Sequence, residues 1–226
     1  MHESRQSIII SCAGMGTRLN RGVPKALLDI DGKPLIIRQL ELLEDCSDVR
    51  VVVGYQAREV MDTVSSYRKD VLFAYNPNYQ TTGTAGSFLL AAASGREYCV
   101  ALDGDLLVNP ADMRRFLQTE GECVGACAPT TEEPVLITPE YRSGRPYAAA
   151  FSRERGSLEW TGLARIRRDH LPSDAWHIYH MLEPLLPLPL LKIRTREIDT
   201  AEDYRQALEW FRRNRAGAPE SGVGGA

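Results

Sequence analysis

The chain has 226 residues, 43% of them hydrophobic and 25% charged, which is enough to bury one sizeable core without help from disulfides or metals. Its formal net charge is only −3 at pH 7, which argues against a strongly basic nucleic-acid-binding surface. The five cysteines form no C-x-x-C pair, so we predict neither a disulfide framework nor a zinc knuckle. We therefore expect a reducing, cytoplasmic compartment and no nucleic-acid partner.

No apolar stretch is long enough to cross a membrane. The first apolar run ends at Gly14, and Pro184, Pro187 and Pro189 divide the leucine-rich segment near residue 185. Residues 216–226 are mainly Gly, Ala, Pro and Ser, a composition typical of a disordered tail. We expect a single domain over residues 1–215, followed by that tail, and no membrane partner.

The first half of the chain alternates β-branched runs with amphipathic segments. Strands are predicted over residues 7–12, 49–53, 71–75 and 98–102, and helices over residues 34–43, 57–67 and 84–93. This β-α alternation is typical of a parallel sheet with helices on both faces. It predicts an α/β fold of three layers.

The second half follows a different pattern. We predict a helix over residues 111–119, then strands over 123–128, 135–138, 147–151 and 162–166, a short helix over 175–182, a strand over 191–194 and a closing helix over 201–213. These strands are expected to continue the first sheet. The predicted fold is a Rossmann-like three-layer α/β/α sandwich with a mixed, mostly parallel central sheet.

A glycine-rich turn follows the first strand. In open α/β sheets ligands bind beyond the carboxyl ends of the strands, and glycines there let backbone N–H groups approach phosphates. The dinucleotide fingerprint does not fit because Leu19 stands where a third glycine is needed, and the Walker pattern does not fit either. An ordinary tight turn is the alternative, but Arg18 and Lys25 add two cations suited to a polyphosphate.

The continuation of this turn carries a family resemblance. Gly14-x-Gly16-Thr17-Arg18 followed by Pro24-Lys25-Ala26-Leu27 resembles the sugar-phosphate nucleotidyltransferases and their small cytidylyltransferase relatives, such as the phosphocholine cytidylyltransferases. The resemblance extends over residues 7–213 and implies the nucleotide-diphospho-sugar transferase type of fold. It implies that the turn holds a nucleoside triphosphate through Ala13, Gly14, Met15, Gly16, Thr17 and Arg18. Arg18 and Lys25 would be the catalytic cations, with Lys25 bridging the nucleotide and the acceptor.

Two acidic motifs occur in the matching order. Asp103 and Asp105 follow the fourth predicted strand, and Asp199 precedes the last helix. Taken alone, such acids are equally well explained as solvated groups or, beside Thr200, as part of a helix cap. The resemblance implies that Asp105 and Asp199 hold a Mg²⁺ cofactor and that Asp103 contacts the nucleotide. Oxygen ligands of this kind suit a hard divalent cation.

The base and the acceptor are less strongly encoded. Residues 75–87 resemble the base-binding loop of the family, which points to Thr82 and Ser87 as further nucleotide-binding residues. The Gly-Thr-Ala-Gly run at residues 83–86 is closer to guanylyl- or uridylyltransferases, whereas the compact length favours CTP. The acceptor is expected in residues 129–190, bound by Lys25, Arg145, Glu159, Trp160 and Trp176.

These acceptor residues leave the chemistry of the acceptor open. Aromatic rings with an acid suit a quaternary ammonium, arginines suit a carboxylate or phosphonate, and each tryptophan is equally well explained as core packing. His170, His177 and His180 receive no catalytic role.

The sequence therefore predicts a Mg²⁺-dependent nucleotidyltransferase that moves CMP from CTP to a small phosphate or phosphonate acceptor. The alternatives are a sugar-1-phosphate guanylyl- or uridylyltransferase, a glycosyltransferase that uses Asp103-x-Asp105 for its metal, and a non-catalytic nucleotide sensor. The chain is expected to act as a monomer or homodimer.

Overall fold

The computed structural model describes residues 5–16, 19 and 22–215. Its first half alternates strands and helices as the sequence predicts. The strands are β1 (Gln6–Cys12), β2 (Val49–Val53), β3 (Val71–Tyr75), β4 (Tyr98–Asp103) and β5 (Leu106–Val108). The helices are the 3-10 turn η1 (Lys25–Leu27) and the α-helices α1 (Leu35–Glu41), α2 (Ala57–Tyr67), α3 (Thr84–Ala92) and α4 (Pro110–Leu117).

The second half contributes mainly strands. They are β6 (Cys123–Cys127), β7 (Leu136–Arg142), β8 (Arg145–Ser152), β9 (Leu158–Arg167), β10 (Leu188–Lys192) and β11 (Thr195–Glu197). Between them lie η2 (Arg168–His170), α5 (Ile178–Leu182) and η3 (Glu183–Leu185), and the described chain closes with α6 (Ala201–Arg215).

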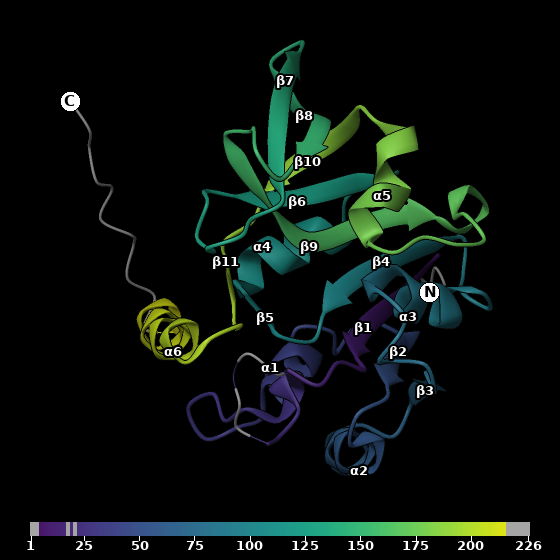
Figure 1. Cartoon of the computed structure of the whole chain (residues 1–226), viewed down its shortest axis with the longest axis vertical. Coiled ribbons are helices and arrows are strands. Elements are labelled where there is room, and N and C mark those ends of the chain that lie inside the picture. The colour runs from purple at the N-terminus through teal and green to yellow at the C-terminus, as the bar shows by residue number, and fades with distance from the viewer. Residues whose placement is uncertain (1–4, 17–18, 20–21, 216–226) are drawn as a thin grey trace.

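One nine-stranded sheet runs through the molecule in the order β3-β2-β1-β4-β9-β6-β10-β8-β7 (Figure 1). The strands from β3 to β4 are parallel, and β6 and β10 are parallel as well. The β9 strand pairs antiparallel with both β4 and β6, so it joins the two halves. The sheet is mixed as predicted, but parallel pairing dominates only in its first half.

Alternating side chains of the strands pack against helices on the two faces of the sheet. Ile8 and Ile10 of β1 join a core with α1, α2 and α4, whereas Ile9 joins a second core with α3 and α5. All three isoleucines are fully buried. This arrangement confirms the three-layer sandwich and turns the carboxyl ends of β1 and β4 toward one common edge.

A smaller third core holds the last helix. Trp210 and Ala207 of α6 pack against Ile30, Leu107 and Ile198, so α6 lies beside the two-stranded β5–β11 sheet (Figure 1). In the described part of the chain, none of the helices is both long and apolar enough to span a membrane.

Several element boundaries differ from the prediction. Helix α5 begins at Ile178 rather than residue 175, because the carbonyl of Trp176 accepts a hydrogen bond from Ala85 N–H and His177, directly before the helix, has an extended backbone. Strand β10 begins three residues early and contains Pro189. Short strands β5 and β11 were not predicted, because three residues carry too little periodicity to recognise.

Candidate active site

The glycine turn after β1 keeps space open at the edge of the sheet. A Cβ at Gly14 would meet nothing within 4 Å, so the surface above this residue is free of protein. Gly16 has a φ of +59°, and a Cβ there would lie 2.9 Å from Cγ of Lys25. Glycine at position 16 is therefore required both by the backbone conformation and by the close passage of the lysine side chain.

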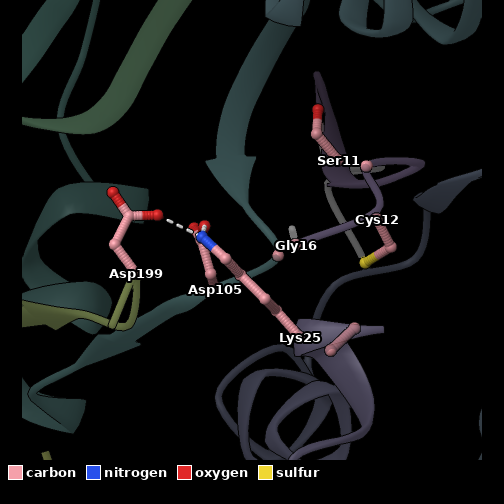
Figure 2. A pocket seen from close by; sticks show the side chains of 9 residues that line it. Ser11, Cys12, Gly16, Lys25, Asp105 and Asp199 are labelled. Atoms are coloured by element: carbon pink, nitrogen blue, oxygen red, sulfur yellow. Dashed lines mark hydrogen bonds and ion pairs between the residues drawn. The ribbon is translucent and has the colours of Figure 1, made fainter. Parts of the chain in front are cut away.

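Lys25 reaches into this space from η1. Its ammonium donates a 2.8 Å hydrogen bond to Oδ2 of Asp105 and also pairs with the carboxylate of Asp199 (Figure 2). Burial by itself lowers the pKa of Lys25, but the charges and hydrogen bonds of the two aspartates outweigh it, so the pKa lies above its ordinary value. Lys25 is therefore a fixed positive charge at neutral pH.

Backbone hydrogen bonds connect the two aspartates. Gly104 N–H donates to the carbonyl of Ser11 at 3.0 Å, which ties the turn between β4 and β5 to the end of β1. Ile198 N–H donates to the carbonyl of Asp105 at 3.1 Å, and Glu197 pairs with Leu106 in the β5–β11 ladder. Asp105 and Asp199 are thereby held together although 94 positions separate them in the sequence.

Glu197 adds a third carboxylate to this pair. Oxygen atoms of Asp105, Glu197 and Asp199 all lie within 4.8 Å of one another. Burial, followed by the charges of Asp105 and Asp199, raises the pKa of Glu197 to about 9. An oxygen-only set of clustered carboxylates is the donor chemistry that Mg²⁺ prefers, so these residues fit the divalent cation expected from the sequence.

Asp103 lies at the end of β4, next to this cluster. Burial and then the charge of Asp105 raise the pKa of Asp103 to about 7. Gly162 of β9 faces it, since a Cβ at Gly162 would lie 2.5 Å from Oδ2 of Asp103. Any larger residue at position 162 would therefore collide with the side chain of Asp103.

Two cavities meet at these carboxylates. The first has a volume of about 210 Å³ and is bordered by the glycine turn, Lys25, Asp105 and Asp199 (Figure 2). The second has a volume of about 390 Å³ and is bordered by Asp103, Glu197 and again Asp199. Because Asp199 lines both cavities, molecules bound in the two would approach each other beside the metal-type ligands.

The second cavity has an aromatic wall. The rings of Phe151, Trp160 and Tyr179 pack with their centroids 6.2–6.3 Å apart, and His177 stacks on Tyr179 at 5.4 Å. Arg153 lies over the ring of Tyr179 at 5.8 Å. Burial and then the positive charges nearby lower the pKa of His177, which favours its neutral form.

Glu159 of β9 also lines the second cavity and is hydrogen-bonded to the loop at residues 130–131. Its carboxylate is buried and accepts hydrogen bonds from the backbone N–H groups of Thr130 and Thr131 and from both hydroxyls. The bond from Thr131 Oγ1 is 2.7 Å long. Glu159 therefore shapes the cavity through the 130–131 loop, with its oxygens already engaged by that loop.

The sequence was also compared with known protein families. Residues 8–172 match the family described as the MobA-like NTP transferase domain. The chain belongs to this family. The match includes the glycine turn, Lys25 and Asp105, and it ends before Glu197 and Asp199, so these two members of the carboxylate cluster lie outside the matched segment.

Individual relatives support the same assignment. The bifunctional protein GlmU of Neisseria meningitidis is 27% identical over 158 residues, which is 69% of this chain and 34% of that protein. The chain thus spans about a third of the length of the curated relatives it matches.

Solved structures show the fold at lower sequence identity. The inositol-1-phosphate CTP transferase of T. maritima superposes with a TM-score of 0.76 at 18% identity, covering 96% of this chain and 98% of that one. A UDP-glucose pyrophosphorylase complexed with UDP-glucose gives 0.75 at 18% identity, covering 93% and 99%. These likenesses confirm the nucleotide-diphospho-sugar transferase type of fold.

Within this family fold, most of the predicted site residues lie close together. Gly14, Gly16, Lys25, Asp105 and Asp199 all line the first cavity. Asp103, Glu159 and Trp160 line the second cavity. Ala13 is buried and Met15 is exposed in the same turn, whereas Thr17 and Arg18 lie outside the described residues.

Thr82 and Ser87 line neither cavity. Asn76, itself buried, donates to Thr82 Oγ1 at 2.9 Å and to Ser87 Oγ at 3.0 Å. The two hydroxyls therefore hold the loop that precedes α3. Thr84, at the start of α3, is the residue of this segment that faces the second cavity.

Two predicted acceptor residues, Arg145 and Trp176, do not line the second cavity. Arg145 begins β8, eight residues before Arg153, and at about 3.3 Å per residue this places it roughly 26 Å along the hairpin from the cavity. Trp176 does not line the cavity either; its side chain is 57% exposed, while its carbonyl accepts from Ala85 N–H. Arg153 and Tyr179 occupy the cavity wall instead.

Sequence reasoning missed Glu197 as a member of the carboxylate cluster. The signal was its position two residues before Asp199 in an extended segment, since alternate residues of a strand face the same side. The predicted cap is confirmed, because Thr200 and Asp203 exchange side-chain and backbone hydrogen bonds. Asp203 also accepts a hydrogen bond from Asp199 N–H at 3.2 Å, so the cap also holds the backbone of Asp199.

Proposed function

We propose that the chain is a Mg²⁺-dependent nucleotidyltransferase that transfers a nucleoside monophosphate, CMP from CTP, to a small phosphate or phosphonate acceptor. The observation that carries the proposal is the pairing of Lys25 with Asp105 and Asp199 beside the open glycine turn. One half-buried cation and a carboxylate cluster lie together beside this open turn. The reaction class also agrees with membership of the NTP transferase family.

The chemistry asks little of a general base. An oxygen of the acceptor's phosphate or phosphonate, already anionic near pH 7, forms a bond to the α-phosphorus of the triphosphate. The bond from that phosphorus to the bridging oxygen breaks, and pyrophosphate leaves. The difficulty is bringing two anions together, and the positive charge of Lys25 reduces their repulsion while fixing the attacking and accepting groups.

Asp105, Asp199 and Glu197 would hold the metal. When bound, Mg²⁺ supplies charge neutralisation and orientation for the phosphate oxygens. Lys25 now shares two of these three carboxylates, so its ammonium and the cation have the same anionic partners. We expect Lys25 to donate to substrate phosphate when the carboxylates engage the metal. Arg18 stays a prediction for the same phosphates.

The second cavity is proposed to take the acceptor. Its lining combines the aromatic rings of Trp160 and Tyr179 with acidic residues, Glu132 and Glu133 among them, and this favours an acceptor whose far end carries a positive charge. Arg153 offers an anion-binding alternative at the same wall. The phosphate or phosphonate end would then lie toward Asp199 and Lys25.

CTP is the proposed donor, and a guanylyl or uridylyl donor is the second candidate. The second candidate rests on the Gly-Thr-Ala-Gly run at residues 83–86, which resembles guanylyl- and uridylyltransferases and whose Thr84 lines the second cavity. Related folds include a CTP transferase and a UDP-glucose pyrophosphorylase, so fold alone does not choose the base. Lys25 in the carboxylate cluster argues against a glycosyltransferase.

The deciding experiment is pyrophosphate release in Mg²⁺. CTP, UTP, GTP, ATP and dTTP are each tested with phosphocholine, small phosphonates, inositol phosphate and sugar 1-phosphates. Release that requires one triphosphate and one acceptor supports the proposal and identifies both substrates. Tight triphosphate binding without release in any combination supports the nucleotide-sensor alternative instead.

A lysine pair provides the matched control. Lys25→Met removes the charge beside Asp105 and is expected to slow release by about 10²- to 10³-fold. Lys33→Met removes a more exposed lysine that pairs with Glu41, outside both cavities. Equal rates in the two variants would contradict the role of Lys25.

A further inference from the structure

Gln39 of α1 contacts the turn that carries Asp105. Its side chain is only 1% exposed. The amide nitrogen donates to the carbonyl of Asp103 at 2.7 Å and to the carbonyl of Leu106 at 2.9 Å. A side-chain amide has two N–H donors, and here both are used on the two residues that flank the turn containing Asp105.

The sheet leaves this turn with little support on that side. Antiparallel pairing of β9 with β4 ends at Ala101, two residues before Asp103. In the described chain β5 pairs only with β11, so its second edge faces α1 rather than another strand. Gln39 therefore supplies, from a helix, the hydrogen bonds that would otherwise come from a neighbouring strand.

The side-chain carbonyl oxygen of Gln39, Oε1, indicates that packing alone does not explain why a glutamine stands at this position. Its Oε1 is buried and has no hydrogen-bond partner among the described residues. A buried unpaired carbonyl is unfavourable, and an apolar side chain of the same length would avoid it. Turning the amide over would place Oε1 against two carbonyl oxygens, so the observed orientation is fixed by Asp103 and Leu106.

We propose that Gln39 is a positioning residue for the metal site, holding the Asp103–Leu106 turn so that the Asp105 carboxylate faces Lys25, Glu197 and Asp199. Gly104 N–H to Ser11 and Ile198 N–H to Asp105 fix the same turn from two other elements. Gln39 completes the set from α1. The inference rests on the proposed metal-dependent function.

Substitution by methionine isolates the hydrogen bonds. Gln39→Met keeps an unbranched chain of similar length and removes both donors. Gln39 also borders a cavity of about 400 Å³ between α1, β5 and α6, so the slightly different shape can be accommodated. Groups that hold metal ligands in place are worth about 10- to 100-fold in metal affinity, so we expect the Kd for Mn²⁺ to rise at least tenfold.

The neighbouring residue is the matched control. Arg38 lies on the same helix, is buried, and donates to the carbonyls of Ile30 and Asp31 at 2.8–3.0 Å, away from the Asp105 turn. Arg38→Met is expected to lower the Tm but to keep the wild-type Kd for Mn²⁺. A merely structural role for Gln39 would give the same result in both variants.

The experiment is Mn²⁺ binding followed by electron paramagnetic resonance, with wild type, Asp105→Asn, Gln39→Met and Arg38→Met in parallel. A weaker Kd in Gln39→Met but not in Arg38→Met supports the inference, and an unchanged Kd in Gln39→Met overturns it. Should Gln39→Met fail to fold, Gln39→Asn keeps the amide but is one methylene too short to span both carbonyls, and its Kd decides in the same way. Absence of any Asp105-dependent Mn²⁺ site in wild type would instead refute the proposed function.

Discussion

Two charge clusters lie at the opposite ends of β1, and they are built in opposite ways. The first, called here the Asp48 cluster, joins Ser7, Asp48, Arg50 and Arg96 near the start of the strand. The second, called the Lys25 cluster, joins Lys25, Asp105, Glu197 and Asp199 beyond the end of the strand. The charges of the Asp48 cluster serve the stability of the fold, whereas those of the Lys25 cluster are available to a ligand.

In the Asp48 cluster every strong group has a partner. Asp48 accepts from Ser7 Oγ at 2.7 Å and from Arg50 Nε at 2.8 Å, and Arg50 also donates to the carbonyls of Ala91 and Ser94. Burial by itself raises the pKa of Asp48, but these hydrogen bonds and the two arginine charges hold it below its ordinary value. The cluster needs nothing further.

In the Lys25 cluster the acids outnumber the cation. One ammonium faces three carboxylates, and the pKa of Glu197 is raised to about 9 by burial and by its acidic neighbours. Ionising all three acids together is costly unless a further positive group joins them. Carboxyl groups with raised pKa values at the ligand-binding edge of a sheet therefore indicate a binding site, whereas carboxylates fully paired with arginines indicate a structural role.

The largest expected effect is on turnover. Asp105→Asn removes a proposed metal ligand and a partner of Lys25, so pyrophosphate release should fall by about 10³-fold or more. The same change relieves repulsion with Glu197 and Asp199, so the Tm should stay equal or rise. Rate and thermal melting are measured on the same preparation, and full activity of this variant would refute the metal assignment.

The corresponding substitution in the Asp48 cluster is expected to lower stability rather than turnover. Asp48→Asn leaves Arg50 buried with a weakened partner, which should cost about 3 kcal/mol of unfolding free energy. For a chain of this size that corresponds to a Tm lower by roughly 6–12 °C. Turnover per folded molecule should not change. A variant that melts normally but reacts slowly would reverse the assignment of the two clusters.

Added metal should distinguish the clusters in the unmodified protein. Mg²⁺ with CTP, at about 100 times its Kd, should stabilise the folded state by about 2.7 kcal/mol. This predicts a Tm rise of roughly 5–10 °C by scanning fluorimetry. The rise should vanish in Asp105→Asn and persist in Lys33→Met, and a rise of equal size in all three proteins would place the ion elsewhere.

Acid should affect the Asp48 cluster in a defined direction. Because the folded pKa of Asp48 is lowered, its contribution to stability is fully present above the unfolded value of about 3.9 and is lost as the pH falls through the folded pKa. The Tm difference between wild type and Asp48→Asn should therefore be largest at neutral pH and shrink below about pH 4. A difference that grows in acid would contradict the lowered pKa.

The smallest expected effect concerns the acceptor. Trp160→Ala removes a ring from the second cavity and should raise the KM for a cationic acceptor roughly 2- to 30-fold with little change in kcat. Trp176→Ala changes an exposed side chain outside that cavity and should leave the KM unaltered. Equal effects of the two substitutions would argue that neither ring contacts the acceptor.

Much of the parallel half of the fold could be predicted because its signals are local. The bounds of β2, β3 and α2 agree with the prediction, since buried β-branched strands and an amphipathic helix carry their own periodicity. The bounds of the strands in the second half of the chain were predicted less well. Strands β7 and β8 are longer than predicted, because their pairing with each other extends a hairpin beyond the part that the core buries.

The sequence by itself pointed to the NTP transferase family and to Lys25, Asp105 and Asp199 as the proposed site residues, because these residues and the glycine turn occur in short recognisable motifs at the ends of strong elements. Only the tertiary structure decided which other residues join them. Glu197 reaches Asp105 through the short β5–β11 pairing, and Gln39 reaches the same turn from α1. Such contacts join residues that are far apart in the sequence and depend on how the elements pack, so no local sequence pattern predicts them.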